Sequence, residues 1–174
     1  MSDLGGFLPL SQRTPDDDAR VSSDRREQLA AVVRLAAGRL AEAAPDDARA
    51  FARDAGLARD LDDGAEADLH RLAAAIATGQ RRTIRDLTAA ARAYLALAGA
   101  EEAPLPSDIS GAVALHASAS APFARRAAIS GHTVRASDAG WSFGRGPEIT
   151  ATADAIVAFL TGVSDTPPRR PPRV

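Results

Sequence analysis

Apolar residues recur at intervals of three and four positions in four stretches of the first hundred residues, the spacing that places them on one face of a helix. The four stripes are Leu29, Val32, Val33, Ala36 and Leu40; Ala48, Phe51, Ala52 and Ala55; Leu69, Leu72, Ala73 and Ile76; and Ile84, Leu87, Ala91, Tyr94, Leu95 and Ala98. Asp24 and Glu27 predict a capping box at the first helix, and Pro45 suits the first turn of the second. Because the joins are short, residues 23–100 are predicted to form an antiparallel, bundle-like part.

A helix, about three strands and a closing helix are predicted for residues 105–163. The helix is expected from Asp108 to about Ser118, with Ser107 as its N-cap. Alternating and turn-forming residues place the strands at 133–136, 141–143 and 148–150, a turn at 138–140 and the closing helix at 153–162. The predicted fold class is therefore α+β, predominantly helical, with the bundle-like part preceding a small α+β unit.

Two tails are expected to flank these parts. Residues 1–22 combine Gly, Pro and an Asp run without an apolar period, which predicts a flexible tail. Residues 164–174 are rich in Pro and Arg and favour an extended, disordered tail. The alternative for this second tail is a docking peptide for a proline-binding groove.

Composition narrows the function classes. The chain has 174 residues, a net charge of −2 and no Cys, and all 21 of its basic residues are Arg, which excludes a thiol nucleophile, a disulfide and a Schiff-base lysine. The near-zero charge argues against nucleic-acid binding. Without a long apolar run or the basic start of a signal peptide, the chain is expected to be cytoplasmic and not to bind a membrane. The missing Lys and Asn and abundant Ala are typical of GC-rich coding, as in an actinobacterial source.

A glycine-rich run with the one Trp of the chain lies between Gly131 and Ile149. Its densest residues are Asp138, Trp141, Gly144, Gly146, Pro147 and Glu148, followed by a helix that ends in Leu-Thr-Gly at Gly162. This pattern resembles the C-terminal half of the mycothiol-dependent maleylpyruvate isomerase family over roughly residues 105–162. A small sheet with a closing helix is also similar to the sterol-carrier type of fold.

The resemblance implies a DinB-like four-helix bundle that holds a divalent metal, zinc, through His, Glu and His, with mycothiol as cofactor. Glu66 and His70 match the Glu-x-x-x-His pair of that site, and Asp63 is a candidate third ligand. No His precedes His70, so the family's first metal-binding motif is missing, and Arg71-Leu72-Ala73 replaces the residues expected after the second His. The metal centre is therefore expected to be reduced or lost.

Arginines and Trp141 are the other candidate contacts. Arg81, Arg82 and Arg85 form a basic cluster that would recognise a carboxylate or the acidic groups of a thiol cofactor; the alternative is a solvated helix face. Trp141 is expected to anchor the sheet on the closing helix through the apolar face of Ile156, Phe159 and Leu160, or else to contact a ligand or partner.

A hydrolase triad and a catalytic His116 are both disfavoured. Ser130, His132 and Asp138 supply the residue types of a triad, but no nucleophile elbow presents the serine. His116 follows Leu115 on a predicted helix and is expected to be a partly buried or surface residue.

Three hypotheses for function follow from these observations. The first is a divergent maleylpyruvate isomerase-like protein that acts as a small-molecule-binding or protein-interaction module. The second is a metal- and mycothiol-dependent isomerase or transferase. The third is a structural or assembly subunit, since Ala-rich helices bury little apolar area each and favour a homodimer.

Overall fold

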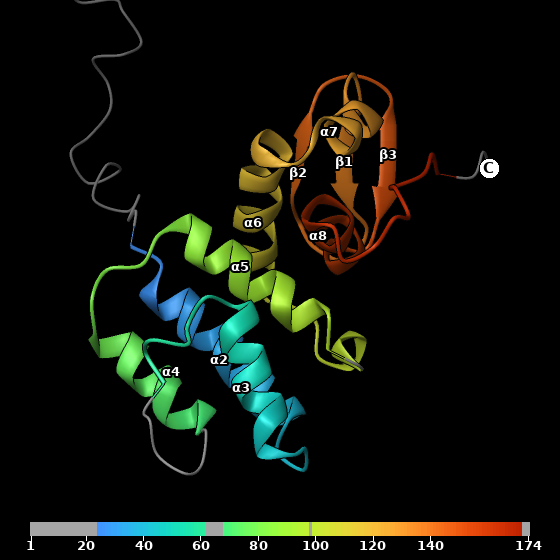
Figure 1. Cartoon of the computed structure of the whole chain (residues 1–174). Coiled ribbons are helices and arrows are strands. Elements are labelled where there is room, and N and C mark those ends of the chain that lie inside the picture. Colours follow the sequence, from blue (N-terminus) through green and yellow to red (C-terminus); the bar gives the residue numbers. More distant parts are fainter. Residues whose placement is uncertain (1–23, 62–67, 98, 172–174) are drawn as a thin grey trace, which may run out of the picture.

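The computed structural model describes residues 24–61, 68–97 and 99–171. The N-terminal helices that it describes are α2 (Arg26–Arg39), α3 (Pro45–Asp54), α4 (Leu69–Thr78) and α5 (Ile84–Leu95). α2 packs against α4 and α5, and α3 packs against α5, so these helices gather at one end of the molecule (Figure 1). Each predicted stripe has buried members, among them Leu29, Phe51, Leu72 and Leu87. The four helices expected from periodicity are therefore confirmed.

The start of α2 differs from the prediction. Arg25 is the N-cap residue, and no side chain caps the helix, so the capping box between Asp24 and Glu27 is not formed. Asp24 accepts instead from the backbone N–H groups of Arg26 and Arg82, each at 3.2 Å. Burial would raise the pKa of the Asp24 carboxyl, but these two N–H donors and the Arg26 guanidinium lower it below its usual value. Asp24 thus ties α2 to the segment before α5, a long-range role that a local pattern does not reveal.

The C-terminal part is a small mixed sheet with helices around it. Its elements are the short 3-10 helix η3 (Ala100–Glu102), α6 (Ser107–Ser120), α7 (Phe123–Ile129), β1 (Thr133–Ala136), β2 (Ser142–Gly144), β3 (Glu148–Ala151) and α8 (Ala153–Thr161). The strand order is β2-β1-β3, with β2 antiparallel and β3 parallel to β1. α6 packs against both α5 and α8 (Figure 1). The fold is α+β and predominantly helical, as predicted.

Three details of this part correct the expectations. Pro106 is the N-cap residue of α6 and no side chain caps it, because Ser107 already belongs to the helix. α7 was not predicted, since its seven residues carry no apolar stripe and Ile129 is its buried residue. β2 begins one residue later than expected, and β3 extends one residue further, to Ala151.

Glycines allow the close approach of the β2–β3 connection to the start of β1. Gly144 and Gly146 have φ values of 88° and 119°. A Cβ on Gly146 would lie 2.1 Å from the carbonyl oxygen of Gly131, and one on Gly144 would lie 2.3 Å from that of His132. The backbone hydrogen bonds of this sheet therefore require glycine at both positions.

The C-terminal segment is ordered against the sheet, which corrects the prediction of a disordered tail for its described residues. Arg169 pairs with Thr150 of β3 in an antiparallel bridge, with N···O distances of 2.6 and 3.1 Å. Arg125 of α7 donates to the carbonyl oxygens of Phe159 and Ser164 at 2.5 and 2.6 Å and thereby holds the end of α8. Residues 172–174 and the predicted tail at residues 1–22 lie outside the described residues.

One continuous apolar core joins the two predicted parts. It runs from α2 to α8, and α5 contacts both α6 and α8. Tyr94 at the end of α5 is fully buried and donates its hydroxyl to the carbonyl oxygen of Ala103, in the segment that leads to α6. Burial raises the pKa of the Tyr94 phenol, in agreement with this position.

Candidate functional site

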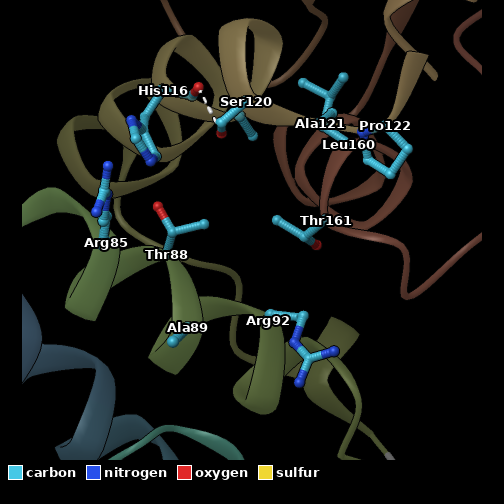
Figure 2. Close-up of a pocket in the computed structure, with 11 residues that line it drawn as sticks. Arg85, Thr88, Ala89, Arg92, His116, Ser120, Ala121, Pro122, Leu160 and Thr161 are labelled. Carbon is cyan, nitrogen blue, oxygen red and sulfur yellow. Dashed lines mark hydrogen bonds between the residues drawn. The ribbon is translucent and has the colours of Figure 1, made fainter.

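A cavity of about 400 Å³ lies where the helical part meets the C-terminal unit, between α5, α6 and α8 (Figure 2). Its lining residues are Arg85, Thr88, Ala89, Arg92, His116, Ala117, Ser120, Ala121, Pro122, Leu160 and Thr161. The volume is within the range of about 300–1,000 Å³ that is usual for small-molecule sites. We call it the α5–α6–α8 cavity.

One face of α5 supplies both guanidinium groups of this cavity. Arg85, Thr88, Ala89 and Arg92 follow one another at intervals of three, one and three positions, so they share a helical face. The opposite face carries the buried stripe that includes Leu87. The start of α5 is fixed by a capping box in which the side chains of Thr83 and Asp86 each accept from the backbone N–H of the other. The orientation of the arginine-bearing face is therefore set by packing and by the cap.

The electrostatic character of the cavity is positive. Among the described residues, its lining holds Arg85 and Arg92 and no carboxylate. Both side chains are exposed, and within the described residues neither forms an ion pair or a hydrogen bond through its guanidinium. By contrast, Arg135 pairs with Glu148 at 2.8 Å. Two cations that remain unpaired beside a cavity favour an anionic ligand.

The hydroxyl groups of the lining already use their protons. Thr88 donates to the carbonyl oxygen of Ile84 at 2.7 Å, Ser120 to that of His116 at 3.0 Å, and Thr161 to that of Val157 at 2.8 Å. Figure 2 shows the Ser120 bond as a dashed line. These hydroxyls present lone pairs to the cavity. The donors available to an anion are therefore the two guanidinium groups and the His116 ring.

Small apolar residues form the rest of the wall. Ala117, Ala121 and Leu160 are buried, and Ala89 and Pro122 complete the apolar lining. An alanine leaves the space that a larger side chain would fill. The Ala-rich composition thus has a local consequence here: the helices approach one another and still enclose a cavity.

The predicted arginine cluster is divided by the structure. Arg85 lines the α5–α6–α8 cavity, whereas Arg81 and Arg82 line a different cavity of about 410 Å³. The Arg82 guanidinium pairs with Asp60, and Arg81 lies 4.0 Å from Asp24 with its side chain 74% exposed. Arg82 therefore has a structural ion-pair role, while Arg85 keeps the role of candidate ligand contact.

The predicted metal ligands are described in part. Glu66 and Asp63 lie outside the described residues. His70 is exposed in the first turn of α4, where its backbone N–H donates to Asp68 at 2.8 Å. His70 and Asp68 border a cavity of about 350 Å³ between α2, α3 and α4. Among residues 24–61, 68–97 and 99–171, no group of three His, Cys, Asp or Glu residues is placed to hold a metal ion. The zinc site at Glu66 and His70 stays a prediction.

Trp141 contacts α6 and the neighbouring strand residue Phe143. Its Nε1–H donates to the Ser110 hydroxyl at 3.2 Å, and its ring stacks on Phe143 with centroids 6.1 Å apart. A Cβ added to Gly111 would lie 3.1 Å from Cδ1 of the indole. Ser110 supplies an acceptor and Gly111 supplies a gap for the ring. The expected packing through Ile156, Phe159 and Leu160 stays a prediction.

The residues of the hypothetical triad have separate roles. His132 Nδ1 lies 3.0 Å from the backbone carbonyl oxygen of Ser130, and Asp138 accepts from the backbone N–H of Ala153 at 2.7 Å, at the start of α8. In the described part of the chain, no hydrogen bond links His132 to Asp138.

Arg92, His116 and Ser120 were not singled out as ligand contacts from the sequence. Arg85 and Arg92 are seven residues apart with Thr88 and Ala89 between them on the same face, a spacing that indicates one arginine-bearing helix face. The position of His116 opposite this face depends on how α6 crosses α5, and no local pattern encodes that.

Comparisons of the chain with protein-family models, with curated proteins and with solved structures find no match. The resemblance to the maleylpyruvate isomerase family therefore stays a prediction. Among the described residues, no helix is long and apolar enough to cross a membrane.

Proposed function

We propose that this protein binds a small organic anion in the α5–α6–α8 cavity. The observation that carries the proposal is a pair of guanidinium groups, Arg85 and Arg92, that have no ion-pair partner among the described residues and lie beside a cavity of about 400 Å³ with an apolar wall. This function agrees with the small-molecule-binding hypothesis from the sequence. In that view the chain is a divergent relative of the maleylpyruvate isomerase family that has kept the C-terminal unit and in which the metal centre is reduced or lost.

Binding combines two contributions. A guanidinium exchanges its water for a carboxylate, sulfonate or phosphate oxygen and forms charge-assisted hydrogen bonds. The apolar part of the ligand is removed from water against Ala117, Ala121 and Leu160, which contributes about 25 cal/mol per Å² of apolar area. The arginines face solvent, so the bound anion stays partly hydrated, while the apolar part of the ligand lies against the buried wall.

A fluorescent anion with an aromatic body tests this proposal. Anilinonaphthalene sulfonate should bind the folded full-length protein at one site per chain, with an increase in fluorescence and an affinity that falls with salt. Because both guanidiniums are exposed, each pair with the sulfonate is worth at most about 1 kcal/mol, or about fivefold in Kd. Arg85→Gln should weaken binding by about two- to fivefold, and the Arg85→Gln/Arg92→Gln double variant should weaken it by at least as much.

The controls separate this site from nonspecific dye binding. Arg126→Gln removes an exposed arginine of α7 outside the cavity lining and should leave the affinity unchanged. Ala89→Leu places a larger side chain on the half-buried wall and should reduce binding without any change in charge. Near-UV circular dichroism verifies that each variant keeps native packing. Equal affinity for the wild type, the Arg85→Gln/Arg92→Gln double variant and Ala89→Leu would overturn the proposal.

A further inference from the structure

We infer that an acidic run of this chain, Asp16, Asp17 and Asp18, binds the arginines at the start of α5 and so competes with a small anion for Arg85. The contact stands on the chain alone, whereas the competition rests on the proposed function. Three features of the molecule support it: the place where the described chain begins, the charges around that place and the short length of chain between it and the run.

The first described residues lie against the segment that leads into α5. The backbone N–H of Arg25 donates to the carbonyl oxygen of Arg82 at 2.9 Å, and the Asp24 carboxylate accepts from the backbone N–H of Arg82 at 3.2 Å. Thr83 follows as the N-cap residue of α5. Figure 1 shows the start of α2, in blue, beside the start of α5. The chain before Asp24 therefore joins the fold at the N-terminal end of the helix that carries Arg85.

The surface around this point is rich in arginine. Arg25 and Arg81 line a cavity of about 410 Å³, and Arg85 follows in the first turn of α5. Arg25 donates to the side-chain oxygen of Gln28 at 2.8 Å, and within the described residues no carboxylate pairs with Arg25 or Arg85. The Arg81 side chain is 74% exposed, with its Nε 4.0 Å from Asp24. We call Arg25, Arg81 and Arg85 the arginine surface.

The carboxylates beside the arginine surface are engaged in the fold. Asp24 pairs with Arg26 at 2.8 Å, and Asp60 pairs with Arg82. Asp86 is held in the capping box of α5. The first-turn N–H groups of α5 add positive potential at the same end of the helix. The arginine surface therefore has a positive character that a run of aspartates complements through charge-assisted hydrogen bonds.

The acidic run is near enough along the chain to reach this surface. Asp18 precedes Asp24 by six residues and Asp16 precedes it by eight. An extended chain spans about 3.3–3.6 Å per residue, so the run can lie up to about 20–30 Å from Asp24. Arg85 is three residues after Arg82, which corresponds to about 5 Å along a helix. An aspartate on Arg85 would occupy a cation that a ligand of the α5–α6–α8 cavity uses.

A zero-length cross-link tests the contact without any ligand. The chain has no Lys, so an arginine-to-lysine variant introduces the one side-chain amine of the protein. A water-soluble carbodiimide joins this amine to a carboxylate that touches it. Trypsin releases the acidic run on a peptide of residues 14–20, which mass spectrometry identifies. In Arg85→Lys and in Arg81→Lys, we expect this peptide to be linked to the new lysine, with a yield that falls as the salt concentration rises.

Two further lysine variants calibrate the yield. Arg135→Lys places the amine beside Glu148, the partner of Arg135 at 2.8 Å, and should cross-link to it. Arg126→Lys places the amine at an exposed position of α7 and should not link to residues 14–20. Products that join two chains are separated by size. If residues 14–20 link to position 85 no more than to position 126, or only between two chains, the inference is wrong and the anion site stands.

Neutralisation of the run tests the competition. A triple aspartate-to-asparagine variant of residues 16–18 should tighten the binding of the dye by about two- to fivefold at low salt. The matched control removes the same charge from three exposed carboxylates outside the cavity lining, and it should tighten binding by less; its substitutions are Glu42→Gln, Asp47→Asn and Asp54→Asn. In the Arg85→Gln background, the two triple variants should have the same effect.

The outcomes separate the inference from the proposed function. If the cross-link forms at position 85 but the two triple variants bind the dye equally, the competition is contradicted and the anion site stands. The competition is also contradicted if the run variant has the same effect in the wild type and in Arg85→Gln. If the cross-link forms and the dye is insensitive to Arg85 and Arg92, the proposed function fails and the contact stands.

Discussion

Gly111 and Trp141 form a contact whose energetic sign can be measured. Gly111 lies inside α6, where replacement of glycine by alanine ordinarily stabilises a helix by about 1 kcal/mol. An added Cβ would lie 3.1 Å from Cδ1, 3.3 Å from Cγ and 3.4 Å from Nε1 of the Trp141 indole. Optimal carbon contacts are about 3.5–4.0 Å. The ring would therefore have to move away from the helix.

The structure restrains that movement. The indole is stacked on Phe143 with an interplanar angle of 17° and hydrogen-bonded to Ser110. Crowding of an extra methyl group into packed surroundings costs about 1–3 kcal/mol. After the helix gain of about 1 kcal/mol is subtracted, Gly111→Ala should lie between no net effect and a loss of about 2 kcal/mol.

A double-mutant cycle isolates this effect. Urea unfolding followed by far-UV circular dichroism gives the free energy of unfolding for Gly111→Ala in the wild type and in a Trp141→Leu background. In the second background the crowding is absent, and Gly111→Ala should stabilise by about 1 kcal/mol. The coupling between the two positions should then be about 1–3 kcal/mol. Gly38→Ala on α2 is the matched control, because a Cβ there meets nothing within 4 Å and should not destabilise.

Trp141 fluorescence reports the same event. Gly111→Ala should shift the emission to longer wavelength as the ring leaves Ser110 and gains water. Two results together would refute the packing of the indole on α6. Gly111→Ala would stabilise the wild type and the Trp141→Leu variant equally, and the Trp141 emission of the Gly111→Ala single variant would equal that of the wild type.

Three further predictions address a half-buried acid, a helix cap and the metal. Burial raises the pKa of the Asp154 carboxyl, and the negative charge of Asp138 raises it further, while the hydrogen bond from the Leu105 N–H partly lowers it. The native state therefore holds the Asp154 proton more tightly than the unfolded chain does. The stability that this proton contributes is present at acidic pH and is lost as the pH rises through the pKa of the folded state. In urea titrations, Asp154→Asn should therefore become more stable relative to the wild type as the pH approaches neutrality. Parallel pH profiles of the two proteins would contradict this prediction. Thr83→Ala removes the acceptor of the α5 capping box and should lower the free energy of unfolding by about 1 kcal/mol. Thr78→Ala is the matched control, because the Thr78 hydroxyl donates within α4, and it should lower the free energy of unfolding by less. Equal losses in the two variants would contradict the role of the cap. Protein purified without a His tag should lack stoichiometric zinc by elemental analysis, and a stoichiometric content that disappears in His70→Ala would instead support the metal-dependent isomerase hypothesis.

Local periodicity was sufficient for most of the fold. The helical stripes around Leu29, Phe51, Leu72 and Leu87 and the alternation in β1 record which side of each element is buried, and burial is what selects those residue types. α7 could not be predicted from periodicity, because Arg125 and Arg126 interrupt the few apolar residues of this short helix. Its position depends on hydrogen bonds from Arg125 to the end of α8. Such a contact leaves no period in the sequence.

Only part of the candidate site, one of its two arginines, could be predicted from the sequence. Arg85 was identified from the sequence as a candidate ligand contact. Arg92 lies on the same face of α5, because seven residues correspond to about two helical turns. The other walls come from α6 and α8, whose packing on α5 is a tertiary property. The separation of Arg82 from this site has the same origin, since its pairing with Asp60 joins segments 22 residues apart.

The bridge between Thr150 and Arg169 determines how the sheet ends. β3 is an outer strand, and without this bridge its backbone N–H and C=O groups would be open to a strand from another chain. The buried Pro168 next to the bridge has no N–H to offer, and on the other side β2 is a strand of three residues that ends at Gly144. Both borders of the sheet are thus poor templates for edge-to-edge pairing, and removal of the residues from Pro167 onward would open the β3 border to such pairing.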